Sequence, residues 1–520
     1  MNPDGISYLR IADFYKSGEW SAAVSAYWSP LYPLLLAAVS SALHPTSYWE
    51  APAAHLLNFG CYLAAFAAFR YMLRSIASTQ DSRRTEDTYL IDFRAPAEWA
   101  CAHVLFLMVS LTWINLSVIT PDMLVMVIVL FASGLTLRLR SETHSRVFFV
   151  LGAIASLGYL AKAVMFPLGL LLIILASWTR RNRRLSLQRF GFAIAGFIVV
   201  SAPQVIAVSK LVGHFSYGET GNDTYAREVN LAPFHWVGLP QGTGIPEHPI
   251  TQVASDPDAF VYPVGEMRSS FPLWDRPAYW VSGIRPHFDC TQQRAVTLPI
   301  LGLYVGATFV MLFVIVGLFF IPRVKGIEST YFPLIVTSIA AFGLYALVYA
   351  ELRYLAGWLL VLFLSVISSM KFFAHVSKPV RSVLAILALL QGISLTVAAW
   401  QETDSFDIAL VGAPAANEYL EIASRLQTMG IMPGSRVAVV GDAFHGYWAR
   451  LGGIQIAGDV PDFADYWNAS DSVRAAINEK FRLAGFKAVI ANRVPRQWSG
   501  AGWRTVGVGN VYVKPLLSVR

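Results

Sequence analysis

The sequence is poor in charged residues and in cysteine. Asp, Glu, Lys and Arg make up only 14% of its 520 residues, whereas 55% belong to the AVILMFWYC set, and the mean hydropathy is +0.50. Soluble domains carry roughly 25% charged residues, so this composition excludes an ordinary soluble protein. Three cysteines, Cys61, Cys101 and Cys290, are too few and too scattered for a disulfide framework or a zinc site. The composition indicates a membrane protein.

The excess of positive charge does not indicate a nucleic-acid partner. There are 40 Lys and Arg residues against 33 Asp and Glu residues, a formal net charge of +7. The basic residues concentrate in short loops between apolar runs, which is the pattern that orients membrane helices. We therefore expect membrane lipids, and no nucleic acid, around this chain.

Apolar runs predict an α-helical polytopic protein with about 10–11 transmembrane helices. A spanning helix needs about 20 apolar residues, and suitable runs lie near 52–73, 97–117, 122–139, 147–162, 164–178, 189–209, 297–320, 331–350, 354–371 and 381–400. A run at 31–44 would form a helix only about 21 Å long, so we expect it to be interfacial or re-entrant.

The positive-inside rule then orients the chain. If 31–44 stays outside, basic loops such as 180–189 face inward, and residues 1–51, the loop 210–296 and everything after 400 lie on the outer, periplasmic side of the inner membrane. We predict a membrane catalytic domain over 1–400, in which 1–51 is a first outer loop with interfacial helices, and a small soluble α/β domain over 401–520.

Within that last segment, which we call the tail, the pattern predicts a helix near 414–429, a strand at 436–440, a helix near 470–484, a strand at 488–491 and a closing hairpin over 503–515. The loop at 441–446 follows the first strand but lacks the G-x-G-x-x-G spacing of a dinucleotide site. We do not expect a nucleotide there.

Four ionisable residues are predicted to share the outer face through different helices: Asp4, Asp122, Lys162 and Arg353. Charges beside membrane spans are costly and are functional candidates. Cations can hold a phosphate and stabilise it as a leaving group, while a carboxylate takes a proton from an attacking hydroxyl. The simpler alternatives are helix capping by the two aspartates, snorkelling of Lys162, and pairing of Arg353 with Glu351 alone.

Two further expectations concern metals and surface charge. No pair among the ten histidines has the i, i+4 spacing of a helical metal site. A divalent cation, Mg²⁺ or Mn²⁺, held by Asp4 and Asp122 stays an alternative to a site without a cofactor, because hard cations accept carboxylates. Asp13 and Glu19 are expected on the solvated face of an amphipathic helix.

The order of these residues resembles that of GT-C glycosyltransferases, and within them the polyprenyl-phosphate-sugar-dependent group that includes protein O-mannosyltransferases and lipid A aminoarabinose transferases. The likeness covers about residues 1–400. It rests on an outer Asp before an aromatic-rich helix, on the phrase Tyr27-Trp28-Ser29-Pro30-Leu31-Tyr32-Pro33, on a second outer Asp, and on Arg353-Tyr354 at a late helix. Two departures are the lack of a transmembrane helix before Asp4, for which we expect an upstream start, and Ser29, because the aminoarabinose transferases carry a lysine in this phrase.

The resemblance implies that Asp4 is the catalytic acid of the first outer loop, Asp122 the acid of the second, and that Lys162 and Arg353 lie at the carrier phosphate. We predict an inverting enzyme that moves a monosaccharide from a polyprenyl phosphate to a lipid, glycan or protein acceptor, with Asp4 as general base. The predicted substrate-binding residues are Lys162, Arg353, Tyr354, Tyr8, Tyr27, Trp28 and Tyr32.

Other functions stay open at this point. A lipid-to-polymer glycan ligase would share the outer-face geometry, but an aromatic loop such as 210–296 favours a smaller, enclosed donor. A lipid or solute transporter would be expected to show internal repeats and polar residues at mid-membrane, neither of which the sequence displays. A scaffold protein with the tail as its binding module is the remaining alternative.

Overall fold

The computed structural model describes residues 1–81, 92–140, 144–178, 182–232, 250–262, 270–275, 283–319, 324–372, 417–498, 501–507 and 510–516, together with single residues between 379 and 397. Most of the predicted span at 381–400 lies outside the described residues. So do 233–249, 263–269 and 276–282 of the predicted outer loop.

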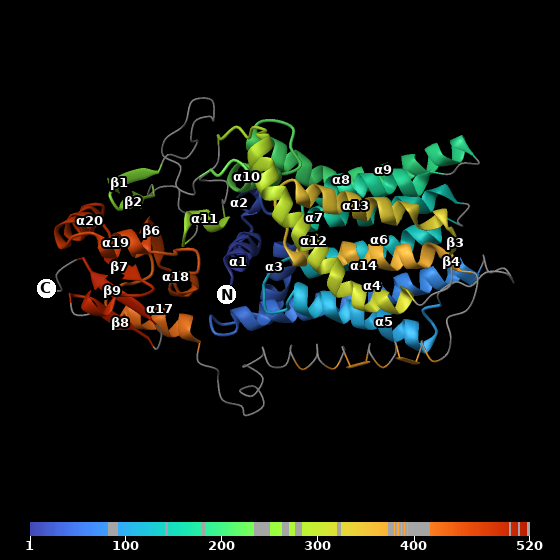
Figure 1. Cartoon of the computed structure of the whole chain (residues 1–520). Coiled ribbons are helices and arrows are strands. Elements are labelled where there is room, and N and C mark those ends of the chain that lie inside the picture. The colour runs from blue at the N-terminus through green and yellow to red at the C-terminus, as the bar shows by residue number, and fades with distance from the viewer. Residues whose placement is uncertain are drawn as a thin grey trace.

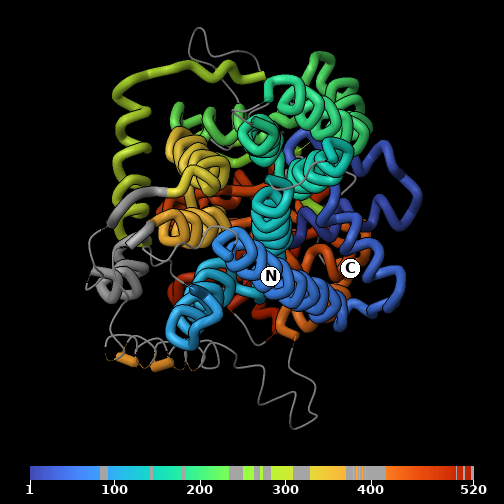
Figure 2. Tube along the Cα trace, turned by 90° about the vertical axis from the view of Figure 1, so that its right-hand side faces the viewer, coloured from blue at the N-terminus to red at the C-terminus, as the bar shows by residue number. Residues whose placement is uncertain are grey.

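A bundle of apolar helices forms one half of the molecule (Figure 1). Among the described residues, five helical segments are long and apolar enough to cross a membrane: α4 (Glu50–Asp81), α6 (Asp122–Leu139), α9 (Arg183–Val212), η4 with α13 (Ser329–Ala346) and α14 (Leu352–Ser369). The bundle also contains α7 (Phe148–Ala161), α8 (Met165–Ser177) and the long α12 (Cys290–Phe319). Viewed along the bundle axis, most of these helices appear end on, whereas α12 is seen from its side at one edge (Figure 2).

Four predicted apolar runs differ from ordinary spans in the structure. Those at 147–162 and 164–178 form α7 and α8, whose 14 and 13 residues make them short apolar helices. The run at 97–117 is α5 (Pro96–Leu107) followed by a π-helical turn, η1 (Met108–Trp113), and the chain leaves the helix before Asn115, which has a positive φ of 53°. The run at 31–44 is α3 (Leu31–Leu43), which packs against α1 (Pro3–Lys16) and α4. Its 13 residues make a helix about 20 Å long, shorter than the hydrocarbon core of a bilayer.

The segments predicted to lie outside gather at one end of the bundle. In Figure 1 the elements α1, α2 (Trp20–Ala23), α11 (Pro272–Asp275) and the tail lie at the left, whereas β3 (Val324–Ile327) and β4 (Met370–Phe372) pair at the right. The common face predicted from the alternation of loops therefore exists. Which side of the membrane that face meets stays a prediction from the positive-inside pattern.

The tail contributes five strands to a seven-stranded sheet with the order β1-β2-β6-β5-β7-β9-β8. At its centre β5 (Arg436–Val440) is parallel to β6 (Gln455–Val460) and β7 (Ala488–Ala491), while β9 (Val511–Pro515) and β8 (Arg504–Val506) continue it as an antiparallel hairpin. One face packs against α17 (Glu418–Thr428) and α18 (Tyr447–Gly452), and the other against α19 (Phe463–Asn468) and α20 (Asp471–Leu483). The tail elements predicted from the sequence are confirmed.

Three strands of this sheet were not predicted. Both β1 (Thr251–Ser255) and β2 (Asp258–Val261) come from the 210–296 loop, and β2 pairs with β6. The sequence of β6 includes Gly458 and Asp459, residue types that are depleted in strands. A Cβ at Gly458 would lie 2.7 Å from the backbone oxygen of Phe260, and buried Asp459 accepts a hydrogen bond from the Tyr262 hydroxyl at 3.1 Å. Partners distant in sequence therefore stabilise this strand.

Candidate active site

Four charged side chains from four segments meet at the end of the bundle that faces the tail. Asp4 lies in the first turn of α1, Asp122 is the first residue of α6, Lys162 directly follows α7, and Arg353 is in the first turn of α14. Lys162 Nζ is 2.7 Å from Asp122 Oδ1, and Arg353 Nε is 3.6 Å from Asp122 Oδ2. Arg353 Nη2 is 3.4 Å from Asp4 Oδ2. The structure therefore brings the four predicted residues together, and their chemical roles stay predictions.

Local backbone structure places the acidic members. The side chain of Asn2 joins the start of α1 to the segment before α6. Its Oδ1 accepts a hydrogen bond from the Ile119 backbone N–H at 3.1 Å. The N-cap residues of the two helices are Asn2 and Pro121, so neither Asp4 nor Asp122 is a capping residue. The capping alternative does not describe these carboxylates.

The positions of the two cations, Lys162 and Arg353, are fixed by the residues around them. Lys162 interrupts the chain between α7 and α8 with an extended backbone, φ −157° and ψ 128°, and its ammonium group lies 3.4 Å from the ring centroid of Tyr354. Glu351 accepts from Arg353 Nε at 2.6 Å and from the Tyr349 hydroxyl at 2.8 Å. Glu351 is thus the nearest partner of Arg353 but not its only one.

The two aspartates differ in their environment. Only 3% of the Asp122 side chain is exposed, and each of its oxygens faces a cation. The Asp4 side chain is 37% exposed and has a single longer contact with Arg353. Burial of the Asp4 carboxylate nevertheless raises its pKa above the ordinary value of 3.8, with Arg353 acting in the opposite direction. Both oxygens of Asp122 are therefore paired with cations, whereas Asp4 is more exposed and makes a longer contact with Arg353.

Aromatic residues of the first 51 residues form a wall beside the charges. The rings of Tyr8 and Trp28 are 4.7 Å apart, those of Tyr8 and Tyr32 are 5.2 Å apart, and those of Tyr27 and Trp28 are 4.8 Å apart. Burial, assisted by Asp4, raises the pKa of Tyr8 well above its usual value, so its hydroxyl stays protonated at neutral pH. Tyr32 is only 1% exposed and packs behind Tyr8.

Sequence reasoning missed residues that support this wall. Asn58 accepts from the Tyr32 hydroxyl at 2.6 Å and donates to the Leu116 and Val118 carbonyls. Thr220 Oγ1 donates to the Tyr27 carbonyl at 2.6 Å. An Asn within an apolar span is a recognisable signal, because polar groups inside membrane helices need partners. Nothing in the local sequence identifies Thr220.

The two carboxylates are a poor fit for a divalent cation. The described residues include no group of three or more His, Cys, Asp or Glu side chains that could hold a metal ion. Asp4 and Asp122 both face Arg353, and Asp122 also faces Lys162. These positive groups would repel Mg²⁺ or Mn²⁺ at the same oxygens, so we derive no step through a metal.

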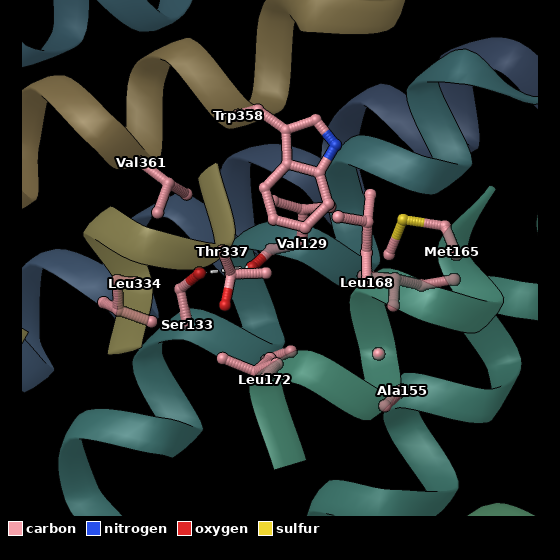
Figure 3. Close-up of a pocket in the computed structure, with 13 residues that line it drawn as sticks. Val129, Ser133, Ala155, Met165, Leu168, Leu172, Leu334, Thr337, Trp358 and Val361 are labelled. Atoms are coloured by element: carbon pink, nitrogen blue, oxygen red, sulfur yellow. Dashed lines mark hydrogen bonds between the residues drawn. The ribbon is translucent and has the colours of Figure 1, made fainter. Parts of the chain in front are cut away.

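An apolar cavity lies in the bundle between α6, α7, α8, α13 and α14 (Figure 3). Its lining includes Val129, Ser133, Met165, Thr337 and Trp358, and no charged residue. The hydroxyls of Ser133 and Thr337 donate to backbone carbonyls of their own helices. None of the predicted site residues lines the cavity, so it is separate from the charged cluster although α6 and α14 contribute to both.

The described residues form a bundle that includes helices long and apolar enough to cross a membrane, with an α/β tail at one end. This arrangement is a GT-C-like fold. Two solved structures of ArnT from Cupriavidus metallidurans resemble it. The one bound to undecaprenyl phosphate has a TM-score of 0.52 at 11% identity, and the apo one 0.46 at 12%. Each match covers 100% of this chain and 94% of ArnT. No protein-family model and no curated protein matches the sequence. The predicted resemblance to lipid A aminoarabinose transferases is therefore confirmed at the level of the fold.

The buried contact between Asp122 and Lys162 gives a stability prediction. Asp122→Asn should lower the melting temperature of the protein in detergent micelles, because it leaves the cations without their shared carboxylate. Adding Lys162→Met should then raise the melting temperature again, since coupling between contacting residues is about 0.5–3 kcal/mol. Arg482→Gln, which breaks an exposed pair with Glu479, is the control and should change little. Independent, additive losses from the two site substitutions would contradict the pairing.

Proposed function

We propose that this chain is a membrane glycosyltransferase that takes a monosaccharide from a polyprenyl-phosphate carrier. The observation that carries the proposal is the convergence of Asp4, Asp122, Lys162 and Arg353 at one end of a GT-C-type bundle. The fold similarity to an ArnT structure bound to undecaprenyl phosphate supports the choice of carrier.

Lys162 and Arg353 are proposed to hold the carrier phosphate. Both lie at the ends of bundle helices, where the phosphate of a lipid anchored in the membrane would be found. Arg353 presents a planar guanidinium whose orientation is fixed by Glu351, and such a fork suits phosphate oxygens. As the sugar–phosphate bond breaks, negative charge grows on the phosphate, and fixed cations stabilise that charge without having to reorganise.

Asp4 is proposed to be the general base. Its carboxylate would accept the proton of the acceptor hydroxyl while that oxygen forms a bond to the anomeric carbon. The bond from this carbon to the phosphate oxygen breaks in the same step, and the polyprenyl phosphate leaves with the electron pair. Attack opposite the phosphate inverts the configuration. Asp122, with both oxygens facing cations, would hold Lys162 and Arg353 in place.

The aromatic wall is proposed to hold the sugar. The faces of Tyr27 and Trp28 suit the C–H groups of a pyranose ring, and Tyr8 lies between them and the charged cluster, where its hydroxyl can donate a hydrogen bond. Tyr354, beneath the Lys162 ammonium, would separate the phosphate from the bundle interior. The acceptor, whether lipid, glycan or protein, is proposed to approach on the outer face of the inner membrane.

Asp4→Asn is expected to abolish transfer, because an amide cannot accept the proton and loss of a general base costs about 100–10,000-fold in rate. The measurement is transfer from a radiolabelled polyprenyl-phosphate hexose to a membrane extract by protein in lipid nanodiscs. Glu19→Gln, an exposed acid of the same segment, should behave as wild type. Unchanged turnover in Asp4→Asn, with the fold intact, would disprove the assignment.

The rate of transfer should also fall as the pH is lowered, and this fall should begin at a pH above the ordinary pKa range of aspartate. The base works only when deprotonated, and burial raises the pKa of Asp4 above 3.8, so protonation removes the active form earlier as the pH falls. The check is kcat against pH, with the melting temperature followed at each pH to separate titration from unfolding. Activity that stays constant down to pH 4 in folded protein would contradict this prediction.

A further inference from the structure

The tail contacts α1 at the end opposite to Asp4. Arg450 in α18 is the centre of this contact: its Nη1 lies 2.7 Å from Asp13 Oδ2, near the end of α1. Its Nη2 and Nε donate to the two oxygens of Glu50, the first residue of α4, at 2.7 and 3.0 Å. The Arg450 side chain is only 10% exposed. The sequence predicted that Asp13 and Glu19 lie on a solvated face. The Asp13 side chain is 38% exposed and is also paired with Arg450, and Glu19 is exposed as expected.

A second contact joins the tail to the aromatic wall. Trp28 Nε1 donates to the Trp274 carbonyl in α11 at 3.2 Å, and Trp274 Nε1 donates to the Phe444 carbonyl, in the loop after β5, at 3.1 Å. Trp274 is 2% exposed. The tail thus contacts the first 51 residues directly at Asp13 and Glu50, and it reaches Trp28 through Trp274 of α11.

Helix α1 packs along α3, and polar contacts hold its two ends. The start is held by Asn2 against Ile119. The last turn is held by Arg450 against Asp13 and by an exposed hydrogen bond from Lys16 to Ser40. Asp4 and Asp13 are about 13 Å apart along the helix axis, so a tilt of α1 moves the Asp4 carboxylate. Its contact with Arg353 is already long, at 3.4 Å. A displacement of about 1 Å at a reacting group can cost about 100-fold in rate.

We propose that Arg450 is a positioning residue: by binding Asp13 at one end of α1, the tail holds Asp4 at the other end against Arg353. This inference rests on the proposed role of Asp4 as general base. In this role the tail affects the reaction by positioning α1, without contacting the substrate. Arg450 forms a fork with Glu50 and a separate bond with Asp13, so each contact can be removed on its own.

The mechanical part is tested by hydrogen–deuterium exchange on the full chain in lipid nanodiscs. In Arg450→Gln and Asp13→Asn, the amides of α1 should exchange about tenfold faster, because the restraint on its last turn is lost. Exchange in α6 and α14 should not change. The control Arg482→Gln removes an exposed arginine of the same tail and should match wild type. Wild-type protection of α1 in Asp13→Asn would overturn the proposal. That variant keeps the Arg450–Glu50 fork, so it also serves if Arg450→Gln fails to fold.

The catalytic part compares Asp13→Asn with Glu50→Gln in the transfer assay. If the contact matters only for stability, Glu50→Gln should be at least as harmful, since it removes the negative charge and one of the two acceptor oxygens that bind Arg450 and Tyr447. The proposal predicts the reverse: kcat falls about 10–100-fold in Asp13→Asn and less in Glu50→Gln, with KM for the donor unchanged. Equal effects, or full activity in Asp13→Asn while Asp4→Asn is inactive, would overturn the inference alone. Full activity in Asp4→Asn would instead overturn the proposed function.

Discussion

The structure depends on one buried carboxylate, Asp122, and on the cations that neutralise it. A charge with 3% exposure at the end of a membrane helix is tolerated only when opposite charges and hydrogen bonds replace water. Lys162 and Arg353 supply them, and so fix α6, α7 and α14 around one point. Arg353 extends the arrangement to α1 through Asp4. Because the cations that balance Asp122 are the ones proposed to hold phosphate, stability and function draw on the same charges.

Much of the fold follows from the sequence because the membrane imposes simple constraints. Apolar runs near 20 residues predicted most of the described bundle helices, and the Lys and Arg residues, concentrated in alternate loops, predicted which loops share an end. What could not be predicted depends on pairing over long distances in the sequence. Strand β6 carries Gly458 and Asp459 and is stabilised by β2 from another loop, and no local pattern reports such a partner.

The same division applies to the site. The four charges were predictable because an ionisable residue beside an apolar span is rare and the topology places all four on one face. Which of the four charges pair with one another could not be predicted. The number of residues between Asp122 and Lys162, or between Asp4 and Arg353, does not indicate how far apart the two side chains lie in the fold. Asp13 illustrates the limit: the sequence predicted only that this acidic residue is solvated, whereas the packing of α18 against α1 pairs it with Arg450.

The central claim is that the charged cluster binds the phosphate of a lipid carrier. The most direct measurement is equilibrium binding of undecaprenyl phosphate and of undecaprenol to the protein in nanodiscs, comparing wild type with Lys162→Gln/Arg353→Gln. Each charge-assisted hydrogen bond is worth about 1.5–3 kcal/mol, so wild type should prefer the phosphate over the alcohol by at least about tenfold, and the double variant should lose that preference. Equal binding of the two lipids by wild type, or an unchanged preference in the variant, would contradict the account.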